Sequence, residues 1–364
     1  MSDDLTGSIQ QQENQIPVWR QFWDQAPEPE AIRDWTRGLT PGLIGAALWI
    51  PWLDGLTKNS LPFGGVRSTF LGMLAGSFAC LPVFYLLTFL VRYKNRPFRQ
   101  VIPNLLGNRA GSLIVLFTHG LLAFAILTVA IDQGSQWYFQ TLTYLKYMSE
   151  PPTTFLRYLT TATWALWVIP IGYGMVRIIA ALLDYVPILI AAVLSLLFIT
   201  ALLHLQEGLP SLVFPSPNLE NHQLAFGNAF RWTFLFGTII SIFAADWGLG
   251  LKRNRDVVLG GLIGLSLSLI VVGSIGIFTI AAFGAPNAPV PSIFEILSQN
   301  GHGITLACGL LIGTYVTAPG VFASYHVLQD LRQVFPRVHH WVWLILKIMA
   351  VQAGIALIHN GLNF

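Results

Sequence analysis

Long stretches without a charged residue divide this chain into predicted membrane helices. A helix needs about 20 apolar residues to cross a hydrocarbon layer of roughly 30 Å, because lipid offers its backbone amides no partner. Uncharged windows of about this length recur between residues 38 and 364. Helices fitted to them predict nine spans, with ends uncertain by a few residues: 41–57, 66–91, 111–137, 157–179, 182–204, 228–250, 256–284, 303–327 and 338–359.

The composition also indicates an integral membrane protein. Hydrophobic residues make up 54% of the 364 residues and charged residues only 10%, and the mean hydropathy is +0.61. A soluble domain carries about a quarter charged residues. The net charge of +3 forms no dense basic stripe, which excludes a nucleic-acid partner. Cys80 and Cys308 both lie in apolar segments, which excludes a disulfide-built secreted domain.

Polar segments between the spans predict the domain organisation. Residues 1–40 hold seven of the 17 acidic residues, and we expect them to form a cytosolic tail. Residues 205–227 contain three prolines and predict a connector loop. This loop separates a first half, 41–204, from a second half, 228–364.

Lysine and arginine placement predicts that the N-terminus faces the cytosol. With that orientation, 14 of the 20 basic residues fall on the inner side and five on the outer side, while Lys347 lies within the last span. Short cytosolic loops of membrane proteins carry an excess of Lys and Arg. We therefore expect a multi-pass protein of the plasma (inner) membrane.

Glycines four residues apart predict close helix packing. Small residues at this spacing share one helical face and let two backbones approach each other. The pairs are Gly72 with Gly76, Gly260 with Gly264, and Gly309 with Gly313.

The sequence shows no enzyme signature. It contains no H-E-x-x-H metal pair, no G-x-S-x-G elbow and no phosphate-binding glycine loop. We therefore expect no catalytic residue and no resident cofactor. An interrupted helix is the better lead, because transporters bind substrates and ions near the bilayer midplane, where broken helices expose backbone groups to a cavity.

The first span, TPGLIGAALWIPWLDGLTKNS, is typical of such an interrupted helix. Pro51 removes a backbone donor. We expect unwinding around 49–55, which would free carbonyls for a cation and leave Trp49 and Trp52 as flat apolar surfaces for a substrate. A proline kink with interfacial tryptophans is the alternative.

The sixth span, RWTFLFGTIISIFAADWGLG, predicts a matching interruption. Gly237 and Thr238 lie near its middle, about 185 residues after the first break. We expect both residues, together with Ser241, to line the substrate cavity.

The eighth span, GLLIGTYVTAPGVFASYHV, carries hydroxyls that would suit a hard monovalent cation. Thr314 and Thr317 share a helical face, and Pro319 leaves the carbonyl of Tyr315 without its usual donor. In the alternative interpretation, the two hydroxyls bond to the preceding turn of their own helix.

Three acidic residues inside the spans, Asp54, Asp132 and Asp246, require an explanation, because an ionised carboxylate in lipid is costly. We expect Asp246 to contact the basic loop at 252–255. We expect a cavity to solvate Asp54, and a local pair with Lys58, four residues further on, is the alternative. Asp132 lies towards the outer end of the third span, where the sequence becomes polar. We expect Asp132 to have an interfacial role.

Four segments resemble the nucleobase–cation symporter-1 family, which includes the cytosine and purine permeases and the hydantoin transporter. They are NLLGNRAGSLIVL before the third span, GYGMVRIIAALLDYVP between the fourth and fifth, AADWGLGLKRNRDVVLGGLIG from the sixth into the seventh, and TAPGVFASYHVLQDLRQVFP at the end of the eighth. The resemblance covers residues 35–360.

This resemblance implies an all-α membrane protein with a leucine-transporter-like fold of two inverted repeats. The first five-helix repeat would cover 41–204, and an incomplete second repeat of about four helices would cover 228–364. Substrate would lie between the first, third, sixth and eighth helices. Because the tenth helix is missing, we expect a fragment, a homo-oligomer that borrows a helix, or a relative that has lost transport.

The resemblance also implies a site for a coupling cation, Na⁺ or H⁺, between the first and eighth helices. Carbonyls near Ala47 and Ile50 would face the carbonyl of Gly313 and the hydroxyl of Thr317.

Three positions depart from the family pattern. Ile126 stands where the family has a base-stacking tryptophan, Val316 replaces the first of two hydroxyls, and Ala318 replaces a substrate-binding asparagine.

The sequence therefore predicts a permease that moves a small solute, such as a nucleobase or related heterocycle, by cation-coupled alternating access. The alternatives are a non-transporting sensor or assembly subunit on the same scaffold, and an amino-acid permease of the same superfamily. The expected partners are a small-molecule substrate and the lipid bilayer. The expected substrate-binding residues are Trp49, Trp52, Asp54, Ile126, Gly237, Thr238, Ser241 and Ala318.

Overall fold

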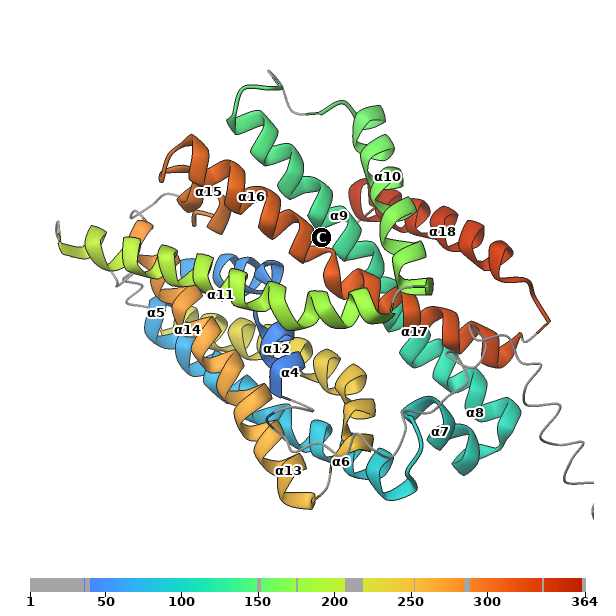
Figure 1. The fold of residues 1–364 in the computed structure, drawn as a ribbon. Helices are drawn as coiled ribbons and strands as arrows, with labels where there is room; N and C mark the ends of the chain where they lie inside the picture. Colours follow the sequence, from blue (N-terminus) through green and yellow to red (C-terminus); the bar gives the residue numbers. More distant parts are fainter. Residues whose placement is uncertain are drawn as a thin grey trace, which may run out of the picture.

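Helices form almost everything that the computed structural model describes (Figure 1). The described residues are 36, 40–148, 152–174, 176–206, 219–251, 253–284, 289–335 and 337–361. The predicted tail, 1–40, lies outside them except for Thr36 and Thr40. In chain order the helices are α4 Thr40–Ala47, α5 Ile50–Ala79, α6 Leu81–Lys94, α7 Phe98–Leu106, α8 Asn108–Val115, η2 Leu116–Gly120, α9 Leu121–Tyr144, α10 Thr154–Gly174, α11 Val176–Gln206, α12 Leu219–Ala244, η3 Ala245–Gly250, α13 Asn254–Leu259, η4 Gly260–Leu267, α14 Ser268–Phe283, α15 Ile293–Ser298, α16 His302–Val316, α17 Ala318–Val334 and α18 His340–Gly361.

All nine predicted spans fall on these helices. Within the described residues, seven helical stretches are long and apolar enough to cross a membrane. The number is lower than nine because the first two spans run together and because α10, which is rich in threonine, does not reach that hydropathy. The first two spans join at Gly65, whose φ of 70° makes a sharp bend inside α5 and suits glycine. The sixth helix starts at Leu219, earlier than predicted.

α5 and α12 pack closely along each other. These two helices contact each other more extensively than any other described pair. Gly72 lies against the backbone carbonyl of Phe226, and a Cβ on Gly76 would be 2.8 Å from the carbonyl oxygen of Phe230. The predicted small-residue face is therefore a helix–helix contact. Around this pair, α11 crosses α4 and α14, and α9 runs past α16 and α17 (Figure 1).

The first helix is interrupted, as predicted, but over a shorter stretch. α4 ends at Ala47, Trp49 has extended backbone angles (φ −68°, ψ 106°), and α5 begins at Ile50. The predicted unwinding through residue 55 is wrong. Pro51 lies in the first turn of α5, where its missing N–H leaves no hydrogen bond unmade, so proline starts the second segment.

The predicted interruption at Gly237 is wrong. α12 continues through Gly237 to Ala244, and the chain narrows to the 3₁₀ helix η3 only afterwards. A Cβ on Gly237 would be 2.6 Å from the sulfur of Cys80. This glycine therefore allows α12 to pack against Cys80 at the junction of α5 and α6, and it does not loosen the helix.

The eighth span bends at Thr317, between α16 and α17. Pro319 lies in the first turn of α17, as Pro51 does in α5. The Thr314 and Thr317 hydroxyls donate to the carbonyls of Leu310 (2.9 Å) and Thr314 (2.6 Å). In the structure, then, both hydroxyls bond to their own helix, which is the alternative interpretation of this span.

Candidate functional site

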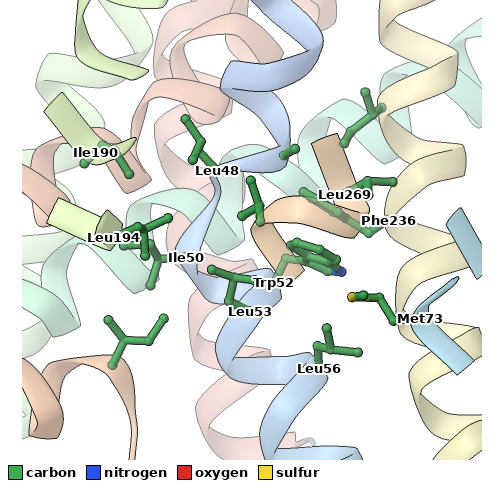
Figure 2. Packing of buried hydrophobic residues seen from close by; sticks show 14 of the residues in the cluster. Leu48, Ile50, Trp52, Leu53, Leu56, Met73, Ile190, Leu194, Phe236 and Leu269 are labelled. Carbon is green, nitrogen blue, oxygen red and sulfur yellow. The ribbon is translucent and has the colours of Figure 1, made fainter. Parts of the chain in front are cut away.

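The interruptions of the first and eighth spans meet inside the bundle. The hydroxyl of Tyr315 on α16 donates to the carbonyl of Gly45 on α4. The indole nitrogen of Trp49 lies 3.3 Å from the carbonyl oxygen of Val316 and donates to it. Figure 2 shows the chain as a thin coil between Leu48 and Ile50. Side chains of each interruption thus donate to backbone carbonyls of the other, and the Gly45 carbonyl also accepts the N–H of Leu48 at 3.2 Å.

A cavity of about 590 Å³ lies beside this junction, between α5, α9 and α12. One part of its lining is aromatic and the other is polar or charged. The aromatic part consists of Trp49, Trp52, Trp137, Trp232 and Phe236, and the polar part includes Asp54, Lys58, Asn59, Gln133, Gln136, Gln140, Arg231 and Ser292.

Aromatic stacking gives the cavity a flat wall. Phe236 of α12 stacks on Trp52 with ring centroids 5.0 Å apart and an interplanar angle of 13°. It also stacks on Trp49 at 5.8 Å and 18° (Figure 2 shows Trp52 and Phe236). Trp52 is almost fully buried. Offset stacks of this kind favour further planar rings.

Asp54 holds a short helix at the mouth of the cavity. Its Oδ1 accepts the backbone N–H of Ile293, the first residue of α15, at 3.0 Å. A carboxylate at a helix N-terminus satisfies a free amide there. The structure thus gives Asp54 a partner 239 residues away, in addition to its neighbour Lys58 at the same cavity.

We expect Asp54→Asn to loosen α15 without disturbing the rest of the bundle. The amide oxygen accepts less strongly than a carboxylate, and loss of a cap costs about 1 kcal/mol. Hydrogen exchange of the amides in 293–298 should therefore speed up roughly fivefold, while exchange in α9 stays unchanged. Unchanged exchange in 293–298 would contradict this role.

The other residues predicted to bind substrate are not among the described residues that line this cavity. Ile126 packs in a second core cluster with α10 and α17, and Gly237 faces Cys80. Ser241 is buried and donates to the carbonyl of Gly237. Thr238 has a buried hydroxyl without a hydrogen-bond partner in the described part of the chain. Ala318 packs against the central core. Their binding roles stay predictions.

The four predicted cation ligands form two separate pairs, one against α9 and one in the central core. A Cβ on Gly134 of α9 would be 3.1 Å from the Gly313 carbonyl oxygen and would touch the methyl group of Thr317. Gly313 and Thr317 therefore lie against α9. Ala47 and Ile50 are buried in the central core. The residues at the end of α16 that contact the first span are Tyr315 and Val316. Cation binding at the predicted ligands stays a prediction.

The polar face of α9 was missed by sequence reasoning. Gln133, Gln136 and Gln140 follow each other at helical spacing and line the cavity together. Uncharged windows hide such residues, because amides carry no charge. A search for polar residues recurring on one face of a predicted span would have found them.

Comparison with solved structures places the chain in a known fold. It is similar to the crystal structure of MhsT in complex with L-phenylalanine, with a TM-score of 0.53 and 16% sequence identity, over 87% of this chain and 78% of that chain. No family model and no curated protein match the chain. The expected fold is confirmed: this is an all-α, multi-pass membrane protein with a leucine-transporter-like bundle.

Proposed function

We propose that this protein is a secondary active transporter that moves a small, planar solute by alternating access. The observation that carries the proposal is the 590 Å³ cavity beside the interruption of the first helix. Cavities next to broken helices are where transporters bind substrates. A sealed midplane would favour the alternative of a non-transporting sensor or assembly subunit.

The lining supports an aromatic substrate with polar edges. The tryptophans and Phe236 give the cavity an aromatic wall, and the glutamines of α9 offer donors and acceptors. A nucleobase or related heterocycle fits this combination, in agreement with the resemblance to the nucleobase–cation symporters. Ile126 and Ala318 do not supply the family's stacking and amide groups, so the α9 glutamines would take over recognition.

An amino-acid substrate is the second candidate. The N-terminus of α5, which has no side-chain cap, reaches the cavity at Trp49, Pro51 and Trp52. A free helix N-terminus binds a carboxylate. MhsT was crystallised with L-phenylalanine, and an aromatic amino acid would use both the α5 N-terminus and the ring stack of this chain.

The proposal includes a driving force and a membrane location. A cation gradient, Na⁺ or H⁺, would drive uptake, and the protein would lie in the plasma (inner) membrane with a cytosolic N-terminus, as a monomer or a homo-oligomer. Coupling requires that the cation bind one conformation more tightly than the other.

Initial uptake rates in proteoliposomes test the proposal. Vesicles holding the protein receive labelled cytosine, hydantoin or L-phenylalanine, with a pH gradient, a sodium gradient or neither. We expect gradient-stimulated uptake of one class, which the unlabelled solute suppresses. Uptake equal to that of protein-free vesicles for every probe would contradict transport of these classes.

A further inference from the structure

A chain of hydrogen bonds leads from the cavity to the surface of the bundle. Gln136, on the cavity wall, donates from Nε2 to Oδ2 of Asp132 at 2.7 Å. The other oxygen, Oδ1, lies 2.8 Å from Nε2 of His359 on α18. Nδ1 of the same imidazole lies 3.3 Å from a terminal nitrogen of Arg157 on α10.

The series of hydrogen bonds has a buried residue, Asp132, at its centre. Asp132 is 2% exposed, so it is buried between helices, and its expected role at the membrane interface stays a prediction. The His359 side chain is 22% exposed and lies at the end of the last candidate membrane span, Trp341–His359. Ionisable groups inside membrane helices mark ion and proton pathways.

The two contacts of His359 assign different roles to its ring nitrogens. The guanidinium of Arg157 has only donors, so we assign the acceptor role to Nδ1, which faces it. Nε2 then donates to Asp132. The imidazole lies between a carboxylate and a guanidinium.

The other charged or histidine side chains described on helices packed against α9 are His119, Glu295, His302, His326, Asp330, Arg332 and Lys347. Several of them have partners elsewhere in the bundle. His119 pairs with Asp330, Glu295 caps its own helix at Ser292, and Lys347 donates to a carbonyl of α17.

We propose that His359 is a proton-binding site that controls the contact between α10 and α18 and is linked to the cavity through Asp132 and Gln136. A proton that binds the Nδ1 lone pair converts the Arg157 contact from attraction to repulsion, while the bond to Asp132 gains an opposite charge. The imidazolium then stays with α9, and Arg157 moves away. Histidine changes charge closest to neutral pH.

The inference deepens the proposed function, because it makes the proton the coupling ion. α10 and α18 lie side by side (Figure 1), and both also contact α9. A change at this three-helix contact therefore alters the support of the helix that forms one cavity wall. Substrate that rearranges Gln136 would in turn alter proton affinity, since coupling between two sites is reciprocal.

A distance measurement tests the proposal without any solute. Spin labels on Leu159→Cys of α10 and Leu357→Cys of α18, both exposed, are placed in a chain carrying Cys80→Ser and Cys308→Ser. We expect the label distance to lengthen as pH falls through the neutral range. His359→Gln keeps both hydrogen bonds but cannot gain charge, so its distance should stay at the high-pH value.

Two further variants should shift the midpoint in opposite directions. Arg157→Gln removes a cation beside the imidazole and should move the midpoint up by roughly one pH unit, whereas Asp132→Asn removes an anion and should move it down by a similar amount. Asp256→Asn is the matched control, because this buried carboxylate caps α13, away from α9, α10 and α18, and it should leave the midpoint unchanged.

Two outcomes overturn the inference: a pH-dependent distance that persists in His359→Gln, or a midpoint that moves in neither Arg157→Gln nor Asp132→Asn. If one of these two variants does not fold, the midpoint of the other alone decides the test. Sodium-driven uptake together with a pH-independent distance would remove this inference and leave the transporter proposal. If the distance changes as expected but the protein transports no solute, the proton-binding site stands and the transporter proposal is contradicted.

Discussion

Gly72→Ala is expected to destabilise the protein strongly, although it adds only one methyl group. The new methyl would collide with the backbone carbonyl of Phe226 and lie 2.9 Å from the Cβ of Ala229. A backbone carbonyl cannot rotate away as a side chain does, so α5 and α12 must separate. Overpacking of this kind costs roughly 1–3 kcal/mol. The melting temperature of the detergent-solubilised protein should fall accordingly.

Gly227→Ala provides the matched control on the partner helix. A Cβ at Gly227 meets nothing within 4 Å, and alanine is favoured over glycine in a helix by up to about 1 kcal/mol. This variant should melt at the same temperature as the parent or higher. Equal melting temperatures for Gly72→Ala and Gly227→Ala would contradict the close packing of α5 on α12.

Val129→Trp is expected to abolish uptake while the protein remains folded. Val129 lies on the cavity wall formed by α9 and is half-buried, so an indole there would occupy the space assigned to the solute. We expect the initial uptake rate to fall about tenfold or more, equivalent to at least about 1.4 kcal/mol of lost binding. Uptake in proteoliposomes with equal protein content measures the effect.

Val271→Trp is the control for adding the same side chain elsewhere. Val271 lies on α14 and is 47% exposed on the surface of the bundle, where a tryptophan meets no cavity. Its uptake should match that of the parent. A similar loss of uptake in both variants would indicate a general effect of the added ring and would contradict the assignment of the cavity.

The fold could be predicted from the sequence because membrane helices leave a direct signal. Charge-free stretches located helices at all nine predicted spans, on which the described residues hold seven candidate membrane-spanning stretches. Pro51 placed the first interruption to within a few residues. Gly237 shows where this reasoning fails, because glycine permits both unwinding and close approach. Only the sulfur of Cys80, at the junction of α5 and α6, reveals which of the two applies.

The partners of the buried carboxylates could not be predicted. Asp54 bonds to a residue 239 positions away, and Asp132 bonds to His359 across 227 positions. Local spacing suggested Lys58 for the first and the membrane interface for the second. Helix packing decides such pairs, and a single sequence holds no record of which helices become neighbours.

Alternating access to the cavity is the central claim, and a cysteine at its wall tests it most directly. Val129→Cys, in a chain with Cys80→Ser and Cys308→Ser, is exposed to a membrane-impermeant maleimide added to either side of oriented vesicles. With a driving gradient and a transported solute, we predict slower labelling from the side that carries Lys58 and faster labelling from the opposite side. Labelling from one side only, unchanged by gradient and solute, would contradict alternating access.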